Sequence, residues 1–287
     1  MLTGGIDLSL VAIANFSAIT ISTLHTAIAA SDPDLANNLG FLIVLAGIAA
    51  GMLGGAFNGF LVSVVGITPI LATLATMQIY NGIAIVWTGG STLYGAPSLL
   101  GSIGQAAVAN VPALFIIFVI TAVLVAMLVN RTALGRMIQL EGANPVAARY
   151  SAIPRRAVLM KTYVVGGLLA GLAGVLFLAR NPTASADYGS SYVLLVIVIA
   201  VLGGTNPTGG FASVFGVVLA TLTLQVVSSG FTAIRLSSYE YAIAQGVILI
   251  AVMIFDSITS TRTKRPRKTN SPPGADIPAS ETSLIRT

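Results

Sequence analysis

The sequence predicts an all-α fold, a polytopic bundle of about eight transmembrane helices. Of its 287 residues, 55% are hydrophobic and 8% are charged, and the mean hydropathy is +0.93. No Asp, Glu, Lys or Arg occurs between Phe41 and Asn130. A water-soluble domain needs charged side chains over most of its surface, whereas about 20 successive apolar residues form a helix that crosses a bilayer. Composition and charge distribution together therefore indicate a membrane protein.

Apolar segments follow one another along most of the chain, and each is expected to form one helix. The sixth is shorter than the ~20 residues that cross hydrocarbon. We expect it to extend into its neighbours or to be a broken helix covered by protein or facing a water-filled cavity. In order, the segments comprise residues 8–30, 39–65, 67–87, 111–130, 162–178, 191–202, 211–230 and 241–258. They make residues 1–258 one transmembrane domain.

Most of the 14 lysines and arginines fall into two clusters, and these clusters orient the bundle. One lies in the connector 131–161 after the fourth segment, and the other follows the eighth segment. Loops rich in Lys and Arg remain in the cytoplasm. An even number of segments separates the clusters, so both are cytoplasmic only if the sixth segment crosses the membrane. The prediction is a multi-pass protein with Met1 and the C-terminus in the cytoplasm.

The tail 259–287 is rich in Ser, Thr, Pro and basic residues and shows no hydrophobic periodicity. Such a composition cannot bury a core, so we expect a disordered, basic cytoplasmic tail that anionic membrane lipid attracts. An isoelectric point near 9.7 could also indicate nucleic acid. The basic residues, however, do not form an interleaved basic and aromatic face, which excludes a nucleic-acid partner.

Small residues recur at helical spacing in two segments. Residues four apart share one face of a helix, and small side chains there let two backbones approach closely within a membrane. The first such groove consists of Gly47, Gly51, Gly55 and Gly59. The second runs through Gly166, Ala170 and Gly174, with Gly167 and Gly171 beside it. These residues are predicted to pack helices together.

The sequence carries no signature of an enzyme. Neither a phosphate-binding GxxxxGK[ST] motif nor an HExxH zinc motif occurs. The lone His25 has no partner at metal-ligand spacing, and we interpret it as a hydrogen-bonded packing residue. No catalytic residue, metal or cofactor is predicted, and the energy for any transport must come from elsewhere.

The membrane core is lined by amides and hydroxyls. An ion-coupled transporter normally keeps ionisable groups inside the membrane, whereas here Asp7 and His25 lie near the ends of the first segment. Amides and hydroxyls replace the hydrogen bonds of water to a neutral polyhydroxy solute without desolvating a charge. The candidate pathway residues are Asn15, Asn58, Thr73, Gln78 and Asn81. For each taken singly, the alternative is a hydrogen bond between packed helices.

A short helix is predicted within the connector. Asn144 is a helix cap, and Pro145 suits the first helical position, where its missing N–H is no loss. Pro154 disfavours a helical Ile153 and so ends the helix near Ala152. The intervening sequence "PVAARYSA" is too short and too polar to cross a membrane. It is expected to lie on the cytoplasmic face, where a cytosolic partner could bind it; the alternative is an ordinary basic loop.

The connector resembles a loop found in a known family of membrane proteins. "GRMIQLEGANPVAARYSAI" is similar to the cytoplasmic coupling loop of permease subunits from bacterial ABC importers of the ribose and simple-sugar family. Further motifs of that family occur in its order and span nearly all of the chain except the tail. They are "LTGGIDLSL", "GGAFNGFLV", "TPILATLATM", "WTGG" and "VLGGTNPTGGFASVFG".

The resemblance implies a multisubunit importer in the bacterial plasma membrane. Two permease subunits, identical or different, would form the pore. Two copies of a cytosolic ABC ATPase would bind the ATP, and a periplasmic binding protein would deliver the sugar. The ATPase contact would comprise Gly142, Asn144, Pro145, Ala147, Ala148 and Arg149, supported by Gly135, Arg136 and Glu141. The permease itself would not be an enzyme.

Two departures from the family pattern affect the expectations. Family members begin roughly two spanning segments before the Gly-Ile-Asp-Leu-Ser motif, so the sequence predicts a chain that lacks those segments. "ADYGSSYVLLVIVIAVLGG" also lacks the acidic residue and the Ala-Ile-Ala-Ala run that often precede Leu-Gly-Gly. Candidate solutes are a ribose-like sugar, a sugar alcohol or autoinducer-2. The alternatives are an ion-coupled sugar symporter and an N-terminally truncated, non-transporting permease fragment.

Overall fold

The computed structural model describes residues 1–190 and 192–235, and beyond these residues 240, 243, 244, 246, 247, 250 and 254. The chain divides into two compact units, Met1–Tyr241 and Ala242–Thr287. The account below concerns the first unit. Two thirds of the predicted eighth segment, 241–258, and the whole of the tail, 259–287, lie outside the described residues.

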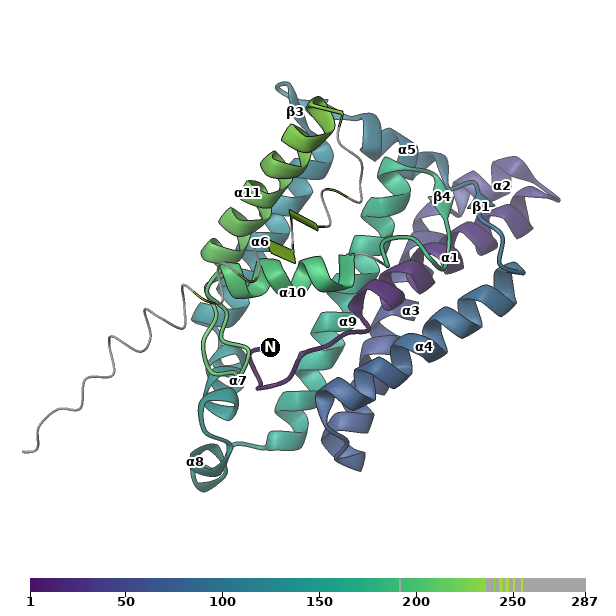
Figure 1. Cartoon of the computed structure of the whole chain (residues 1–287). Helices are drawn as coiled ribbons and strands as arrows, with labels where there is room; N and C mark the ends of the chain where they lie inside the picture. The colour runs from purple at the N-terminus through teal and green to yellow at the C-terminus, as the bar shows by residue number, and fades with distance from the viewer. Residues whose placement is uncertain are drawn as a thin grey trace, which may run out of the picture. The chain divides into compact units, whose positions relative to one another are not determined.

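The described chain is helical almost throughout, which confirms the predicted all-α membrane fold (Figure 1). Within it, six helices are long and apolar enough to cross a membrane. These are α1 (Leu10–Ala29), α3 (Gly40–Phe60) continued by the π-helix η1 (Leu61–Val65), α4 (Pro69–Thr88), α6 (Ala113–Arg131), α9 (Arg155–Arg180) and α11 (Val214–Ala233). They correspond to the predicted first to fifth and seventh segments.

Shorter elements connect the long helices. The short helices are α2 (Pro33–Asn38), α5 (Ser98–Gln105), α7 (Ala133–Ala143), α8 (Pro145–Tyr150) and α10 (Tyr192–Leu202). The strands are β1 (Leu93–Tyr94), β2 (Ala107–Val108), β3 (Val111–Pro112) and β4 (Thr183–Ala184). Strand β1 pairs antiparallel with β4, and β2 pairs with β3. The connector after α6 is therefore largely helical, and α9 begins seven residues before the predicted 162, as soon as Pro154 has ended the preceding turn.

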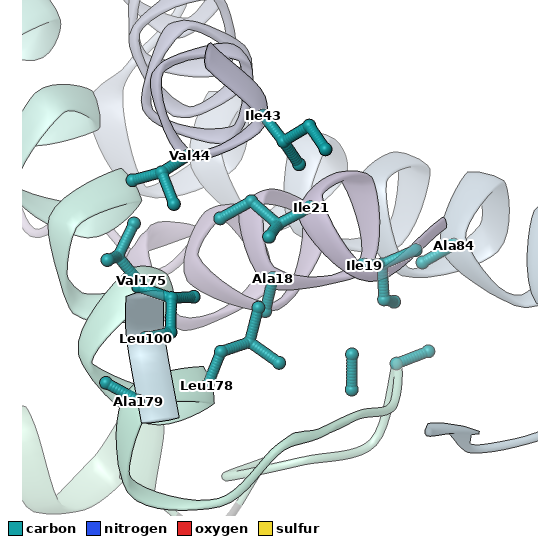
Figure 2. Packing of buried hydrophobic residues seen from close by; sticks show 12 residues of the cluster. Ala18, Ile19, Ile21, Ile43, Val44, Ala84, Leu100, Val175, Leu178 and Ala179 are labelled. Atoms are coloured by element: carbon teal, nitrogen blue, oxygen red, sulfur yellow. The ribbon is translucent and has the colours of Figure 1, made fainter. Parts of the chain in front are cut away.

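The core forms where α1 packs against α3 and α9 (Figure 2). Ile19 and Ile21 of α1 are fully buried in it. Ile43 and Val44 of α3 belong to the same cluster, and so does Leu178 of α9. The side chains are aliphatic, so the packing depends on shape and on dispersion contacts.

The glycines of α3 lie against the glycines of α9. A Cβ atom added to Gly51 would lie 2.7 Å from the Cα of Gly171, and one added to Gly167 would lie 2.7 Å from the Cα of Gly55. Real Cβ atoms do not approach other atoms so closely, so only glycine fits at this contact. Nearby, the hydroxyl of Ser17 in α1 donates a hydrogen bond of 2.8 Å to the carbonyl of Gly47. Backbones therefore meet along the groove that the glycine spacing predicted.

The chain between α9 and α11 runs from one end of the bundle to the other as a short helix, α10, with irregular backbone on either side. At one end, β4 pairs with β1; at the other, the loop after α10 contacts the end of α7 at Ala143. Helix α10 has only 11 residues, and irregular backbone at either side completes the connection. Asn15, in the middle of α1, donates from its side-chain amide to the carbonyls of Ala186 (2.9 Å) and Tyr188 (2.7 Å). These bonds satisfy backbone groups that apolar surroundings would otherwise leave unpaired.

Candidate functional site

The predicted connector helix is present as α8. Its cap is Asn144, whose Oδ1 accepts hydrogen bonds from the backbone N–H groups of Val146 (3.1 Å) and Ala147 (3.0 Å). The helix ends at Tyr150, and Ala152, two residues before Pro154, adopts a positive φ of 56°. The start therefore has the cap inferred from the sequence, whereas the end comes two residues before the predicted Ala152.

Helix α8 has one anchored side and one free side. Ala148 is 3% exposed and faces the rest of the connector. Val146 is 64% exposed and Tyr150 89% exposed, and the neighbouring Arg149 is also exposed. The residues of α8 open to another protein thus include Val146, Arg149 and Tyr150, and Pro145 and Ala147 are exposed as well. Ala148, by contrast, holds the helix in place.

Helix α7 fixes α8 to the bundle. Its cap, Thr132 Oγ1, accepts a hydrogen bond of 3.0 Å from the Gly135 N–H, and Gly135 packs directly on the backbone of Leu128 and Val129 at the end of α6. The side-chain amide of Gln139 donates to the carbonyl of Val129 (3.0 Å). Helices α6 and α7 are consequently joined by backbone contact, and a force on α8 meets a rigid support.

An ion pair ties the connector to α9. The carboxylate of Glu141, 2% exposed, accepts a bond of 2.9 Å from Nε of Arg155, whose side chain is 67% exposed. A carboxylate buried to this degree requires a partner, because desolvation without compensation is costly. Glu141 thus holds the last turn of α7 against the first turn of α9.

A cavity of about 1400 Å³ opens beside this connector. Arg149, Arg155 and Arg156 line it on the connector side, and Ser63 of η1 and Thr68 before α4 line it on the bundle side. Among the described residues that line it there is no Asp or Glu, and Glu141, bonded to Arg155, lies behind the lining, so this part of the cavity is positively charged and suited to an acidic surface. Ser63 and Thr68 were not predicted as site residues, because their sequence neighbours are those of an ordinary apolar helix end.

A polar network lies inside the bundle near the start of α1. Asp7 Oδ1 accepts hydrogen bonds from the Ser9 backbone N–H (2.9 Å) and hydroxyl (2.7 Å), and the Asn58 amide donates to the Ser9 oxygen (2.7 Å). The Tyr80 hydroxyl donates to the Gly54 carbonyl (2.9 Å) and lies 3.4 Å from Asn58 Oδ1. Burial raises the pKa of the Asp7 carboxyl above its ordinary value, although the bonds from Ser9 act in the opposite direction. The network joins the chain before α1 to α3 and α4.

Comparison with known proteins identifies the class of this bundle. A family model described as "Branched-chain amino acid transport system / permease component" matches residues 1–255. The chain belongs to this permease family.

Individual relatives agree with the family match. The chain is 32% identical over 260 residues to the D-allose transport system permease protein AlsC of Escherichia coli K12, covering 91% of this chain and 77% of that protein. It is 30% identical over 259 residues to the autoinducer 2 import system permease protein LsrC of Escherichia coli K12 DH10B, covering 89% and 72%. It is 31% identical over 258 residues to the ribose import permease protein RbsC of Bacillus subtilis 168, covering 89% and 77%. No solved structure gives a significant match.

These matches confirm the family recognised from the sequence motifs. The permease thus combines a helical bundle with a connector whose helix α8 has a free face. The residues predicted for the ATPase contact and its support differ in exposure. Arg136, Asn144, Pro145, Ala147 and Arg149 are exposed, whereas Gly135, Glu141 and Ala148 are buried; Gly142 is half-buried. A partner of the permease would therefore touch the first group and depend on the second group only through the support it gives.

The predicted pathway residues of the permease are not among the residues that line the cavity beside the connector. Asn15 holds the segment before α10, and Asn58 belongs to the polar network. Thr73 Oγ1 accepts a hydrogen bond from the Leu8 N–H (3.1 Å) and donates to the Pro69 carbonyl (2.8 Å). Gln78 and Asn81 lie further along α4, where Gln78 is exposed and Asn81 half-buried. The first three residues thus bond separate parts of the fold, Asn15 to the loop before α10, and Asn58 and Thr73 to the chain just before α1, and the pathway remains a prediction.

The sequence interpretation missed Asp7, Ser9 and Tyr80 as members of the polar network. Asp7 and Ser9 stand in the quoted motif "LTGGIDLSL", and their spacing of two is typical of an acidic side chain that bonds the backbone of a following turn. That signal could have predicted the turn. Their contact with Asn58 could not be predicted, since it depends on how α1 and α3 pack.

The Glu141–Arg155 ion pair leads to a prediction about stability. Replacing Arg155 by leucine leaves the buried Glu141 carboxylate unpaired and is expected to lower the free energy of unfolding by about 1–3 kcal/mol. The matched control is Arg156→Leu, an exposed neighbour in the same turn, expected to change it by less than ~0.5 kcal/mol. Thermal midpoints of the two purified variants in detergent check this. Equal shifts would mean that the ion pair does not stabilise the connector.

Proposed function

We propose that this chain is the membrane-spanning permease subunit of an ABC importer that carries a monosaccharide or related polyhydroxy solute into the cytoplasm. Its relatives are named for the transport of D-allose, autoinducer 2 and ribose, which supports a small, neutral, oxygen-rich solute. The amides and hydroxyls of the bundle suit such a solute, since they exchange hydrogen bonds without desolvating a charge. The permease itself catalyses no reaction in this proposal.

The observation that carries the proposal is the geometry of α8. It is a capped, exposed helix on a rigid support, and it stands beside a positively charged cavity. A separate cytosolic ATPase would bind its exposed face and move it as ATP is bound and hydrolysed. This requires the connector to face the cytoplasm, as the basic residues favour. The other partners would be a second permease subunit, a periplasmic sugar-binding protein and membrane lipid.

Uptake in cells tests this proposal against the symporter alternative. A strain lacking the permease gene, with and without a plasmid copy, is supplied in turn with labelled D-ribose, D-allose and autoinducer 2. We expect plasmid-dependent uptake of at least one solute that stops when ATP is depleted with arsenate and continues in the presence of a protonophore. Uptake that survives ATP depletion but stops with the protonophore would establish a symporter. No plasmid-dependent uptake of any of the three would contradict the assigned solute class.

A further inference from the structure

Three distant parts of the backbone meet at the end of α7 without side chains between them. They are Gly142 at the end of α7, the chain before α1 at Leu2 and Gly4, and the loop between α10 and α11 at Gly209 and Gly210. The Gly210 N–H donates a hydrogen bond of 2.9 Å to the Leu2 carbonyl. We call these five residues the glycine clasp.

The clasp leaves no room for side chains. A Cβ atom added to Gly142 would overlap the Leu2 carbonyl oxygen and lie 2.6 Å from the Gly210 nitrogen. One added to Gly209 would lie 2.6 Å from the Gly4 nitrogen and 2.9 Å from the Gly142 oxygen. Because backbone atoms cannot change rotamer to relieve such a contact, a displacement of one part toward the others must move them, and the bond from the Gly210 N–H to the Leu2 carbonyl joins two of the parts directly.

The chain from the clasp to α1, residues 2–9, then runs along the bundle as a strap. Gly5 packs directly against the ring of Pro69 at the start of α4. The Leu8 N–H donates to Thr73 of α4, and Ser9 receives the hydrogen bond of Asn58 from α3. The strap thus ends in the polar network of the bundle.

At its other end, the clasp adjoins α8. Gly142 is followed by Ala143 and by the cap Asn144, on which α8 begins. A Cβ atom added to Gly210 would lie 2.9 Å from the Cβ of Ala143. No residue of the clasp lies on the exposed face of α8, so a partner bound there would act on the clasp only through the position of α7.

We propose that the glycine clasp is the mechanical link that carries a displacement of α8 to the pore. The proposal rests on the function proposed above and assigns Gly142, Gly209 and Gly210 as positioning residues for coupling. When the ATPase moves α8, the end of α7 moves with it and displaces both the strap and the α10–α11 loop. The strap passes the displacement to α3 and α4, and the loop passes it to α10 and α11. The two sides of the bundle therefore respond together.

The test compares two glycines of the same loop. Gly209 and Gly204 both have positive φ values, 99° and 81°, so alanine introduces a similar backbone strain at each. A Cβ atom at Gly204 would meet nothing within 4 Å, whereas one at Gly209 would press on the strap and on Gly142. Each variant is reconstituted in vesicles with its ATPase and binding protein. Uptake of labelled D-ribose, D-allose or autoinducer 2 is then measured per ATP hydrolysed.

We expect Gly209→Ala to bind the ATPase normally but to lower uptake per ATP at least tenfold, and Gly204→Ala to retain the wild-type ratio. Equal ratios for the two variants would overturn the proposal. If the wild-type chain shows no ATP-dependent uptake at all, the proposed function fails instead, so the two failures are distinguishable.

A milder substitution provides a second measurement if Gly209→Ala does not fold. A Cβ atom added to Gly4 of the clasp would lie 3.1 Å from the Thr208 carbonyl oxygen, a tight contact that a small shift can relieve. The matched control is Gly66→Ala, since Gly66 has a similar φ (87° against 80°) and a Cβ atom there would meet nothing within 4 Å. Gly4→Ala should lower uptake per ATP at least threefold, whereas Gly66→Ala should retain the wild-type ratio. Equal ratios in these two variants would overturn the proposal.

Discussion

Replacing Gly55 by alanine is expected to destabilise the bundle more than any other single added methyl group in α3. The new Cβ would overlap the Tyr163 carbonyl oxygen and lie 2.7 Å from the Cα of Gly167. Both are backbone atoms of α9, so the two helices must separate along the whole glycine groove. Overpacking of a tight core costs about 1–3 kcal/mol, and we expect the upper end of that range because no flexible side chain can yield.

The matched control for this prediction is Gly82→Ala in α4. A Cβ atom at Gly82 would meet nothing within 4 Å. Because alanine is a better helix former than glycine, this change is expected to be neutral or to stabilise by up to about 1 kcal/mol. Thermal midpoints and yields of monodisperse protein in detergent measure both variants. Similar midpoints would show that the α3–α9 contact is not as close as the structure has it.

Replacing Tyr150 by aspartate is expected to release the ATPase without unfolding the permease. The Tyr150 side chain is 89% exposed on the free side of α8. Exposed aromatic residues that anchor an interface typically cost at least about 2 kcal/mol when removed, which weakens binding by more than about tenfold. Co-purification of the ATPase with the tagged permease, together with the thermal midpoint of the permease alone, checks both parts of the prediction.

The exposure of each side chain decides which residue serves as the control and why Tyr150 rather than Ala148 is replaced. Tyr94 in β1 is also exposed, at 74%, but lies far from α8 in the fold. Tyr94→Asp should leave ATPase binding unchanged, and an equal loss in both variants would contradict the assignment of the interface. A charged residue at Ala148 would be a poorer test, because Ala148 is 3% exposed and its replacement would damage the anchoring of α8 itself.

Features that depend on residues close together in the chain were predictable from the sequence, whereas contacts between distant residues were not. Helix α8 is determined by neighbouring residues, the cap Asn144 and the breaker Pro154, and both were recognisable from the sequence. The groove at Gly51 and Gly55 was recognisable too, because its periodicity lies within one helix. Local rules and periodic patterns therefore sufficed for the transmembrane class, for the order of the six long helices described and for the connector helix, but not for the short helices α2, α5 and α7.

The remaining features depend on residues far apart in the chain. The clasp joins Leu2, Gly142 and Gly210, and nothing in the immediate sequence of any of them indicates the others. The burial of Glu141 likewise depends on where α9 begins after its turn. Such contacts arise from tertiary packing, which also explains why Asn15 and Asn58, predicted as pathway residues, make bonds that join separate parts of the fold.

The central claim is that α8 lies in the cytoplasm and is held by a separate ATPase. Since the chain lacks cysteine, Val146→Cys creates a single thiol on the free face of α8, where Val146 is 64% exposed, and leaves Tyr150 in place. In membranes that contain the whole importer, a bifunctional maleimide-to-lysine reagent should join this thiol to the ATPase. A membrane-impermeant maleimide should label it in inside-out vesicles stripped of the ATPase but not in right-side-out vesicles. Labelling of right-side-out vesicles, or the absence of an adduct with the ATPase, would contradict the account.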